Sequence, residues 1–145
     1  MWPARFRLSS WRRERQMEPD HENPWAEYGA YFDADGLAEY LGTSVDAIRQ
    51  AITAGAVLYL VTGDAQSIMP AAQFSDAKPD LVPRLSEMTK HMDPAREDPA
   101  GVLIWALAPQ RALGGRTPIE VLRSSEDVAI AQLMASAARI GALAG

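Results

Sequence analysis

The segment from Trp105 to Leu122 constrains the fold most strongly, because helix stop and start signals lie close together in it. Its first apolar run ends at Gly114-Gly115, and glycine is unfavourable inside a helix. Thr117 then precedes a proline, and a glutamate follows three residues after the threonine. A threonine N-cap with glutamate at the third helical position forms a capping box, and proline suits the first helical position. The segment therefore predicts a helix, a glycine turn and a second, capped helix.

Composition limits the classes of protein to which the chain can belong. Its 145 residues are 48% hydrophobic and 23% charged, which suits one ordinary domain or two small ones with a packed core. The chain has no cysteine, so disulfides and thiolate metal sites are excluded. No apolar run approaches the roughly 20 residues of a membrane span. We therefore expect a cytoplasmic protein that does not bind membranes.

The formal net charge of −5 is unevenly distributed. Residues 1–17 carry five arginines and one glutamate, a net of +4, which leaves −9 for the rest of the chain. Residues 1–30 are expected to form a flexible arm and linker, because the part after Met17 is acidic and interrupted by prolines. The arm lacks the apolar core of a secretory signal. It is either a tail that precedes a natural start at Met17, or a basic arm that lies on DNA phosphates or in the minor groove.

Residues 31–76 have the pattern of a small winged helix-turn-helix domain. Either Asp33 or Asp35 can cap a helix over roughly 34–41, and Gly42 ends it. Either Thr43 or Ser44 can cap the following helix, which stops at Gly55. Residues 57–61 are rich in strand formers and residues 67–69 return after a Thr-Gly-Asp turn, which predicts a β hairpin as the wing.

The second of these helices is the candidate DNA-reading element. In this interpretation Arg49 donates two hydrogen bonds to guanine and Gln50 pairs with adenine. The short side chains of the same face contact bases or phosphates, and the complete predicted set is Ser44, Ala47, Arg49, Gln50 and Thr53. Asp46 and the scarcity of basic residues argue against tight binding. The alternative interpretation is a helical hairpin that serves as a core element or as a protein-interaction module.

Residues 77–145 are predicted to form a helical domain for partner binding or dimerisation. Helices are expected over roughly 81–92, 100–108, from Thr117 onward and over 126–140. Large apolar residues of this half form either the core or an interface: Trp105, Leu107, Leu113, Ile119 and Leu122. Tryptophan and arginine frequently anchor interfaces, so the predicted partner-binding residues are Trp105, Arg111, Arg116 and Arg123.

No arrangement of residues in the chain predicts catalysis. The two histidines, His21 and His91, are about 70 residues apart, and no metal-binding, phosphate-binding or nucleophile-elbow motif occurs. Carboxylates gather in loops and helix starts, where solvation and capping account for them. We therefore expect a protein without metal or cofactor that is not an enzyme.

Two stretches resemble known families of bacterial regulators. The run from Leu37 to Ser44, with Ile48-Arg49 and Ala54-Gly55 after it, resembles an excisionase- or MerR-like helix-turn-helix opening. Residues 69–74, Met-Pro-Ala-Ala-Gln-Phe, resemble a segment of small antitoxin-like regulators. The second half resembles the toxin-binding domain of Xre/MbcA/ParS-type antitoxins, and the matching positions are Trp105, Leu107, Pro109, Leu113, Gly115, Pro118 and Leu122.

This resemblance implies a protein with two binding functions. The first half would bind double-stranded operator DNA and autoregulate its operon. The second half would dock on a cognate toxin, often one that acts on NAD, and cover its active site. Because two-fold symmetry doubles the DNA contacts of a small module, we expect a homodimer. The alternatives are a stand-alone phage- or plasmid-type DNA-binding protein, that is an excisionase or repressor, and a protein-interaction adaptor without DNA binding.

Overall fold

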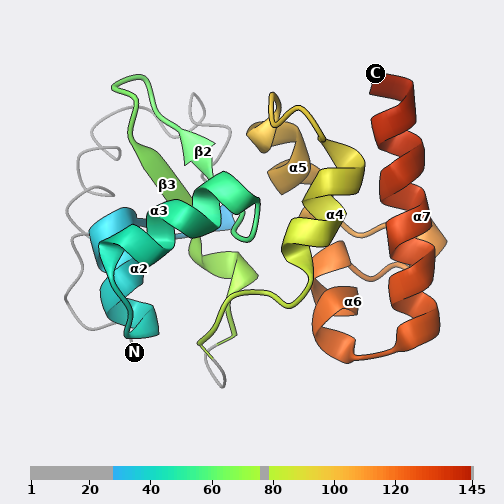
Figure 1. The fold of residues 1–145 in the computed structure, drawn as a ribbon. Helices are drawn as coiled ribbons and strands as arrows, with labels where there is room; N and C mark the ends of the chain where they lie inside the picture. The colour runs from blue at the N-terminus through green and yellow to red at the C-terminus, as the bar shows by residue number, and fades with distance from the viewer. Residues whose placement is uncertain (1–27, 76–78, 145) are drawn as a thin grey trace. The chain divides into compact units, whose positions relative to one another are not determined.

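The computed structural model describes residues 28–75 and 79–144 (Figure 1). The predicted basic arm, the start at Met17 and most of the predicted linker before residue 30 lie outside the described residues. The described part is mainly helical, with six α-helices and one small three-stranded antiparallel sheet. By their internal contacts the described residues divide into two compact units, residues 28–50 with 59–75 and 79–80, and residues 51–58 with 81–144.

The first two helices begin and end where local capping residues place them. Helix α2 (Ala34–Leu41) is capped by Asp33, whose Oδ1 accepts a hydrogen bond of 2.7 Å from the amide of Gly36. The helix ends at Gly42, which adopts a left-handed φ of 73°. Helix α3 (Val45–Ala54) follows, and Ser44 Oγ accepts from the amide of Ala47 at 3.1 Å. The predicted helix pair is confirmed, with Asp33 and Ser44 as the caps.

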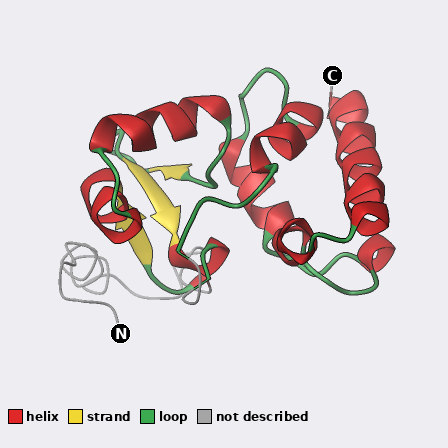
Figure 2. Ribbon diagram, turned by 60° about the horizontal axis from the view of Figure 1, so that its bottom comes forward, coloured by secondary structure: helices red, strands yellow, loops and turns green. Residues whose placement is uncertain are grey.

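A three-stranded sheet accompanies these helices (yellow in Figure 2). The strands are β1 (Tyr31–Asp33), β2 (Leu60–Val61) and β3 (Ser67–Pro70), in the order β1-β3-β2. The predicted hairpin is present as β2 and β3, but β2 is shorter than the predicted strand over 57–61. Only Leu60 and Val61 of that run pair with β3, whereas the opposite edge of β3 pairs with β1, a strand that the sequence pattern does not predict.

An aromatic cluster fills the core of this first unit. Phe32 of β1 is fully buried and stacks on Tyr40 of α2, with ring centroids 5.0 Å apart. Phe74 lies edge-on to Phe32 at 6.1 Å, just after the short 3-10 helix η3 (Ala71–Gln73). Stacked and edge-on rings add to the free energy gained by burial. The strand that holds Phe32 therefore ties α2 to the sheet.

Helix α4 (Leu85–Met92) starts later than the predicted residue 81. Pro83 and a left-handed Arg84, with φ of 61°, precede the helix and prevent an earlier start. The Arg84 guanidinium donates two hydrogen bonds to the Glu87 carboxylate, at 2.9 and 3.1 Å. These bonds hold the pKa of Glu87 below its ordinary value. The start of α4 is thus set by the backbone at Pro83 and Arg84, and the exposed ion pair with Glu87 adds little to it.

The rest of the second unit is helical. Its elements are α5 (Pro99–Ala106), the 3-10 helix η4 (Arg111–Leu113), α6 (Pro118–Ser124) and α7 (Asp127–Ala144). Helix α7 packs along α4 and also contacts η4 and α6 (Figure 1). It continues past the predicted end at residue 140, and Gly141 lies inside it, facing the end of α4. A Cβ at Gly141 would lie 2.0 Å from the carbonyl oxygen of His91 at the end of α4.

Replacing Gly141 by alanine tests this close approach. Glycine to alanine inside an exposed helix stabilises a protein by up to about 1 kcal/mol. Here we expect the opposite sign, since the new methyl group has backbone within 2.0 Å and the two helices must separate. Urea denaturation of the wild type and G141A measures the difference. An unchanged or increased free energy of unfolding would show that α4 and α7 do not meet at this glycine.

Candidate functional site

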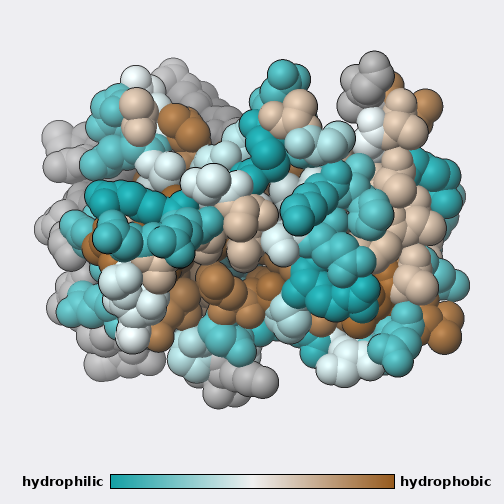
Figure 3. All heavy atoms as spheres, in the orientation of Figure 1, coloured by the Kyte–Doolittle hydropathy of each residue, from teal (hydrophilic) through white to brown (hydrophobic). Residues whose placement is uncertain are grey.

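The exposed face of α3 carries most of the residues predicted to read DNA. Arg49, Gln50 and Thr53 are exposed, while Ile48 and Ala51 are buried on the opposite face. The other two predicted residues are less available to contact DNA. The hydroxyl of the exposed Ser44 is used to cap the helix, and Ala47 is half-buried. The structure thus leaves three predicted side chains on one exposed stripe of the helix, whose visible surface is largely hydrophilic (teal over α3 in Figure 3).

The charge of this stripe is low. The guanidinium Nη1 of Arg49 lies 3.4 Å from Asp46 Oδ1. The Arg49 side chain is 69% exposed and the Asp46 side chain is 84% exposed. Ion pairs this exposed contribute little free energy, so the guanidinium can leave Asp46 at small cost. Residues 28–75 contain five acidic side chains and one basic side chain, Arg49. Phosphate contacts need lysine and arginine, so this part of the chain offers few of them.

The β2–β3 turn at the predicted wing is also acidic. Its exposed residues include Asp64, and no basic residue lies between β2 and β3. The turn is closed by Thr62, whose amide donates to the carbonyl of Gln66 at 2.8 Å. The hydroxyl of Thr62 also donates to Asp64 Oδ1. The wing is therefore well formed but has no cation for a phosphate.

The carboxyl end of α3 is held by two side chains that the sequence pattern does not single out. Thr89 of α4 donates from its hydroxyl to the carbonyl of Gly55 at 2.9 Å. The guanidinium of Arg96 donates to the carbonyls of Thr53 and Ile52, the latter at 2.8 Å. These partners are 34 to 44 residues away in sequence, so local pattern gives no signal for them. All five residues belong to the second unit.

Gly55 is required at this end of α3 for two separable reasons. Its φ of 73° is left-handed, and a Cβ would lie 2.8 Å from Thr89 Cγ2. Gly42 has the same φ of 73°, but a Cβ there would have nothing within 4 Å. We expect Gly42→Ala to cost about 1–2 kcal/mol from backbone conformation alone, and Gly55→Ala to cost clearly more. Chemical denaturation of both variants measures the difference. Equal losses would mean that Thr89 does not pack closely on Gly55.

In the second unit, Gln110 organises the predicted glycine turn. Its side-chain amide donates to the carbonyls of Trp105 and Ala108, at 2.9 and 3.1 Å, and so closes the end of α5. Its backbone amide donates to the carbonyl of Arg116 at 3.0 Å, and its carbonyl accepts from Gly115 at 3.0 Å. No capping or periodic pattern in the sequence marks Gln110 for this role. This one residue joins the last turn of α5 to the segment that enters α6.

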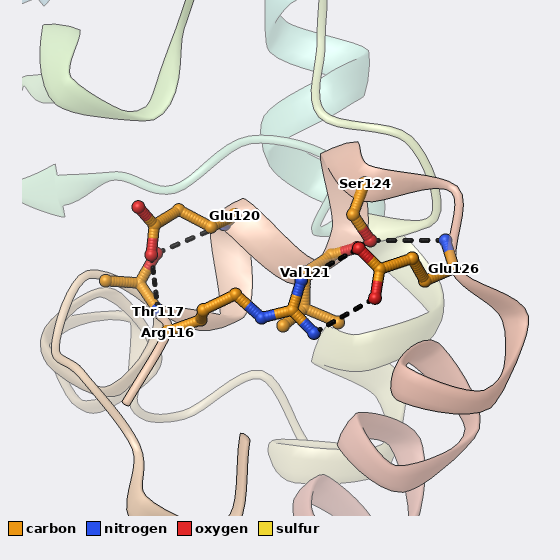
Figure 4. Close-up of polar contacts among 6 residues, drawn as sticks. All are labelled: Arg116, Thr117, Glu120, Val121, Ser124 and Glu126. Atoms are coloured by element: carbon orange, nitrogen blue, oxygen red, sulfur yellow. Dashed lines mark hydrogen bonds and ion pairs between the residues drawn. The ribbon is translucent and has the colours of Figure 1, made fainter. Parts of the chain in front are cut away.

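The predicted partner-binding residues fall into different environments. Trp105 is half-buried on α5, and Arg111 is exposed in η4. Arg116 forms a two-bond ion pair with Glu126, at 3.0 and 3.2 Å, which joins the start of α6 to the start of α7 (Figure 4). Arg123 is half-buried in the last turn of α6. Arg111 is therefore the one fully exposed member of the set, while Trp105, Arg116 and Arg123 are half-buried.

The apolar residues of the motif divide between core and surface. Leu113, Ile119 and Leu122 are buried, which supports a core role for them, whereas Leu107 is half-buried like Trp105. Ile104, which is absent from the predicted set, is 45% exposed on α5. Residues 99–119 contain two arginines and no acidic residue. Helix α5 thus presents an uncharged surface, with Arg111 as the exposed cation that follows it.

Substitutions of Thr117 measure how much the capping box at the start of α6 contributes to stability. The hydroxyl of Thr117 accepts from the amide of Glu120 at 3.1 Å, and Glu120 Oε1 accepts from the amide of Thr117 at 2.8 Å (Figure 4). Thr117→Ala removes the first of these bonds and should cost about 0.5–2 kcal/mol. Thr117→Ser keeps it and should cost much less. Thermal denaturation compares the two variants, and equal losses would assign the effect to the lost methyl group instead.

Neither metal binding nor membrane insertion gains support from the described residues. Within residues 28–75 and 79–144, no three histidine, aspartate or glutamate side chains are grouped to hold a metal ion. In the same part of the chain, no helix has the length and apolar character needed to cross a bilayer. The chain matches no protein-family model, no curated protein and no solved structure.

Proposed function

We propose that the chain is an antitoxin-like regulator that acts by occupying surfaces, without chemistry of its own. In this proposal the second unit docks on a cognate toxin protein, and the first unit is a winged helix-turn-helix that binds operator DNA. The regulator acts as a homodimer in the cytoplasm and autoregulates its operon. The observation that carries the proposal is the helix, glycine turn and capped helix from α5 to α6, because α5 presents the exposed Ile104 and the half-buried Trp105, and the exposed Arg111 follows in η4.

The surface of α5 supports protein binding for a physical reason. Helices that are apolar on all sides are normally buried, yet Ile104 is 45% exposed and Trp105 is half-buried. Gln110 and the capping box hold this helix and α6 in fixed local geometry. A preorganised surface loses less conformational entropy when a partner binds. Aromatic and arginine side chains on such a surface are typical interface anchors.

The DNA-binding part of the proposal rests on α3. Arg49 and Gln50 lie together on its exposed face, and the weak pair with Asp46 leaves the guanidinium able to reach a base. Because residues 28–75 contribute one cation, phosphate contacts would come chiefly from the arginines of residues 1–17. A dimer would double both kinds of contact.

The acidity of the first unit favours one alternative function. With five acidic residues against Arg49, residues 28–75 suit a protein-interaction adaptor that does not bind DNA. The stand-alone excisionase or repressor remains the other alternative, in which the helical unit contacts no protein partner. The three functions differ in what copurifies with the chain from its native host.

A pull-down of the tagged protein from its native host separates these functions. We expect the wild type to retain one stoichiometric protein partner and DNA from upstream of its own coding sequence. Arg49→Ala should lower affinity for that duplex roughly tenfold and keep the protein partner. Ile104→Glu should lose the protein partner, because it places a charge on the apolar face. Fluorescence anisotropy with the labelled upstream duplex measures the DNA affinity.

Val128→Glu is the matched control for Ile104→Glu. Val128 is 75% exposed on α7, so the substitution adds the same charge to an exposed apolar position away from α5. It should leave partner capture unchanged. Retention of the partner by I104E would overturn the proposed surface. A partner without any bound DNA would support the adaptor, and DNA without a partner would support the stand-alone regulator.

A further inference from the structure

One short loop of the second unit makes the caps of two different helices. Residues 93–98 connect α4 to α5. The carboxylate of Asp93 accepts from the amides of Glu97 and Asp98, at 3.0 and 2.9 Å, and so fixes the loop from inside. A carboxylate that binds the following amides in this way closes a local turn. The loop is therefore a defined structure and not a loose connection.

Arg96 of this loop caps the carboxyl end of α3. Its guanidinium donates to the carbonyls of Ile52 and Thr53, which lie in the last turn of the helix, where carbonyls lack partners within the helix. A cation at this end also interacts favourably with the helix dipole. Arg96 itself has a left-handed φ of 57°, a conformation that non-glycine residues adopt when their surroundings impose it. The position of the guanidinium thus depends on the geometry of the loop.

Asp98, at the other end of the loop, caps α5. Its Oδ1 accepts from the amide of Gly101 at 3.0 Å. A Cβ at Gly101 would lie 2.1 Å from Asp98 Oδ2, so the carboxylate is seated directly on the first turn. Proline at the first helical position completes this start. The backbone amide of Asp98 also donates a hydrogen bond to Asp93 Oδ2. Asp98 therefore links the cap of α5 to the loop that holds Arg96.

We infer that residues 93–98 couple the start of α5 to the order of the last turn of α3. A protein that binds α5 and moves its first turn displaces Asp98, then the Asp93 turn, and finally Arg96. The last turn of α3 then loses its cap and opens more often. The regulatory meaning of this coupling rests on the proposed function, in which α5 binds a protein and α3 carries Arg49 and Gln50 toward DNA. The coupling itself needs neither ligand.

Amide hydrogen exchange on the full chain, followed by NMR without DNA or partner, tests the coupling. Arg96→Ala should raise the exchange rates of the Ala54 and Ala56 amides by about tenfold, because charge-assisted hydrogen bonds to the last turn are lost. Asp98→Ala should raise the same rates, although its side chain bonds to Gly101 and not to α3. Unchanged rates at Ala54 and Ala56 in R96A would overturn the cap, and unchanged rates in D98A would overturn the coupling.

Thr117→Ala is the matched control, because it removes the N-cap of another helix in the same unit. It corrects for exchange that arises from lower stability of the unit as a whole. In T117A the Ala54 and Ala56 rates should rise by less than in D98A. Equal effects in T117A and D98A would overturn the inference. These outcomes are independent of whether the chain binds DNA or a toxin, so failure of the coupling and failure of the proposed function are distinguishable.

Discussion

Short helices make this chain dependent on its caps. Helices α2, α4 and α5 have eight residues each. The first four amides and the last four carbonyls of any helix lack partners within it, so in an eight-residue helix every residue leaves a backbone group to be satisfied elsewhere. Side chains satisfy part of this need at the starts of α2 and α5, whereas α4 begins without a side-chain cap. Asp33, Ser44, Asp98 and Thr117 each accept a hydrogen bond from a first-turn amide.

Caps of this kind are local, which is why the sequence predicts them well. Thr117 with its proline and glutamate indicates the start of α6 to the residue, and Gly42 indicates the end of α2. The predicted start of α4 is too early, because the left-handed conformation of Arg84 is not visible in an apolar pattern. Strand β1 is also not predicted, because local sequence gives no signal for it. Three residues are too short for a periodic signal, and the strand exists because β3 and the stack of Phe32 on Tyr40 stabilise it.

Long-range caps account for most of what the sequence could not show. The bonds of Arg96 to the end of α3 and of Thr89 to Gly55 join residues that are tens of positions apart. Gly55 is a predictable helix stop from its type alone, but its close approach to Thr89 depends on the tertiary fold. Among the predicted partner-binding residues, the sequence could not distinguish Arg116, which is paired with Glu126, from the exposed Arg111. Ile104 gives no signal of its exposure, because an isoleucine in an apolar helix is most often buried.

Charge decides how the two candidate surfaces compare. Helix α5 has no charged residue and its end is bonded to Gln110, so in the proposed function it would bind a protein by burying area it already presents. The exposed face of α3 has suitable side chains in Arg49 and Gln50, but acidic residues surround them in sequence. Attraction to a polyanion scales with the number of phosphates neutralised, so one such unit alone offers few contacts to DNA phosphates. In the proposed function, DNA binding would therefore need additional positive charge, from a second copy or from residues 1–17, whereas protein binding by α5 would need neither.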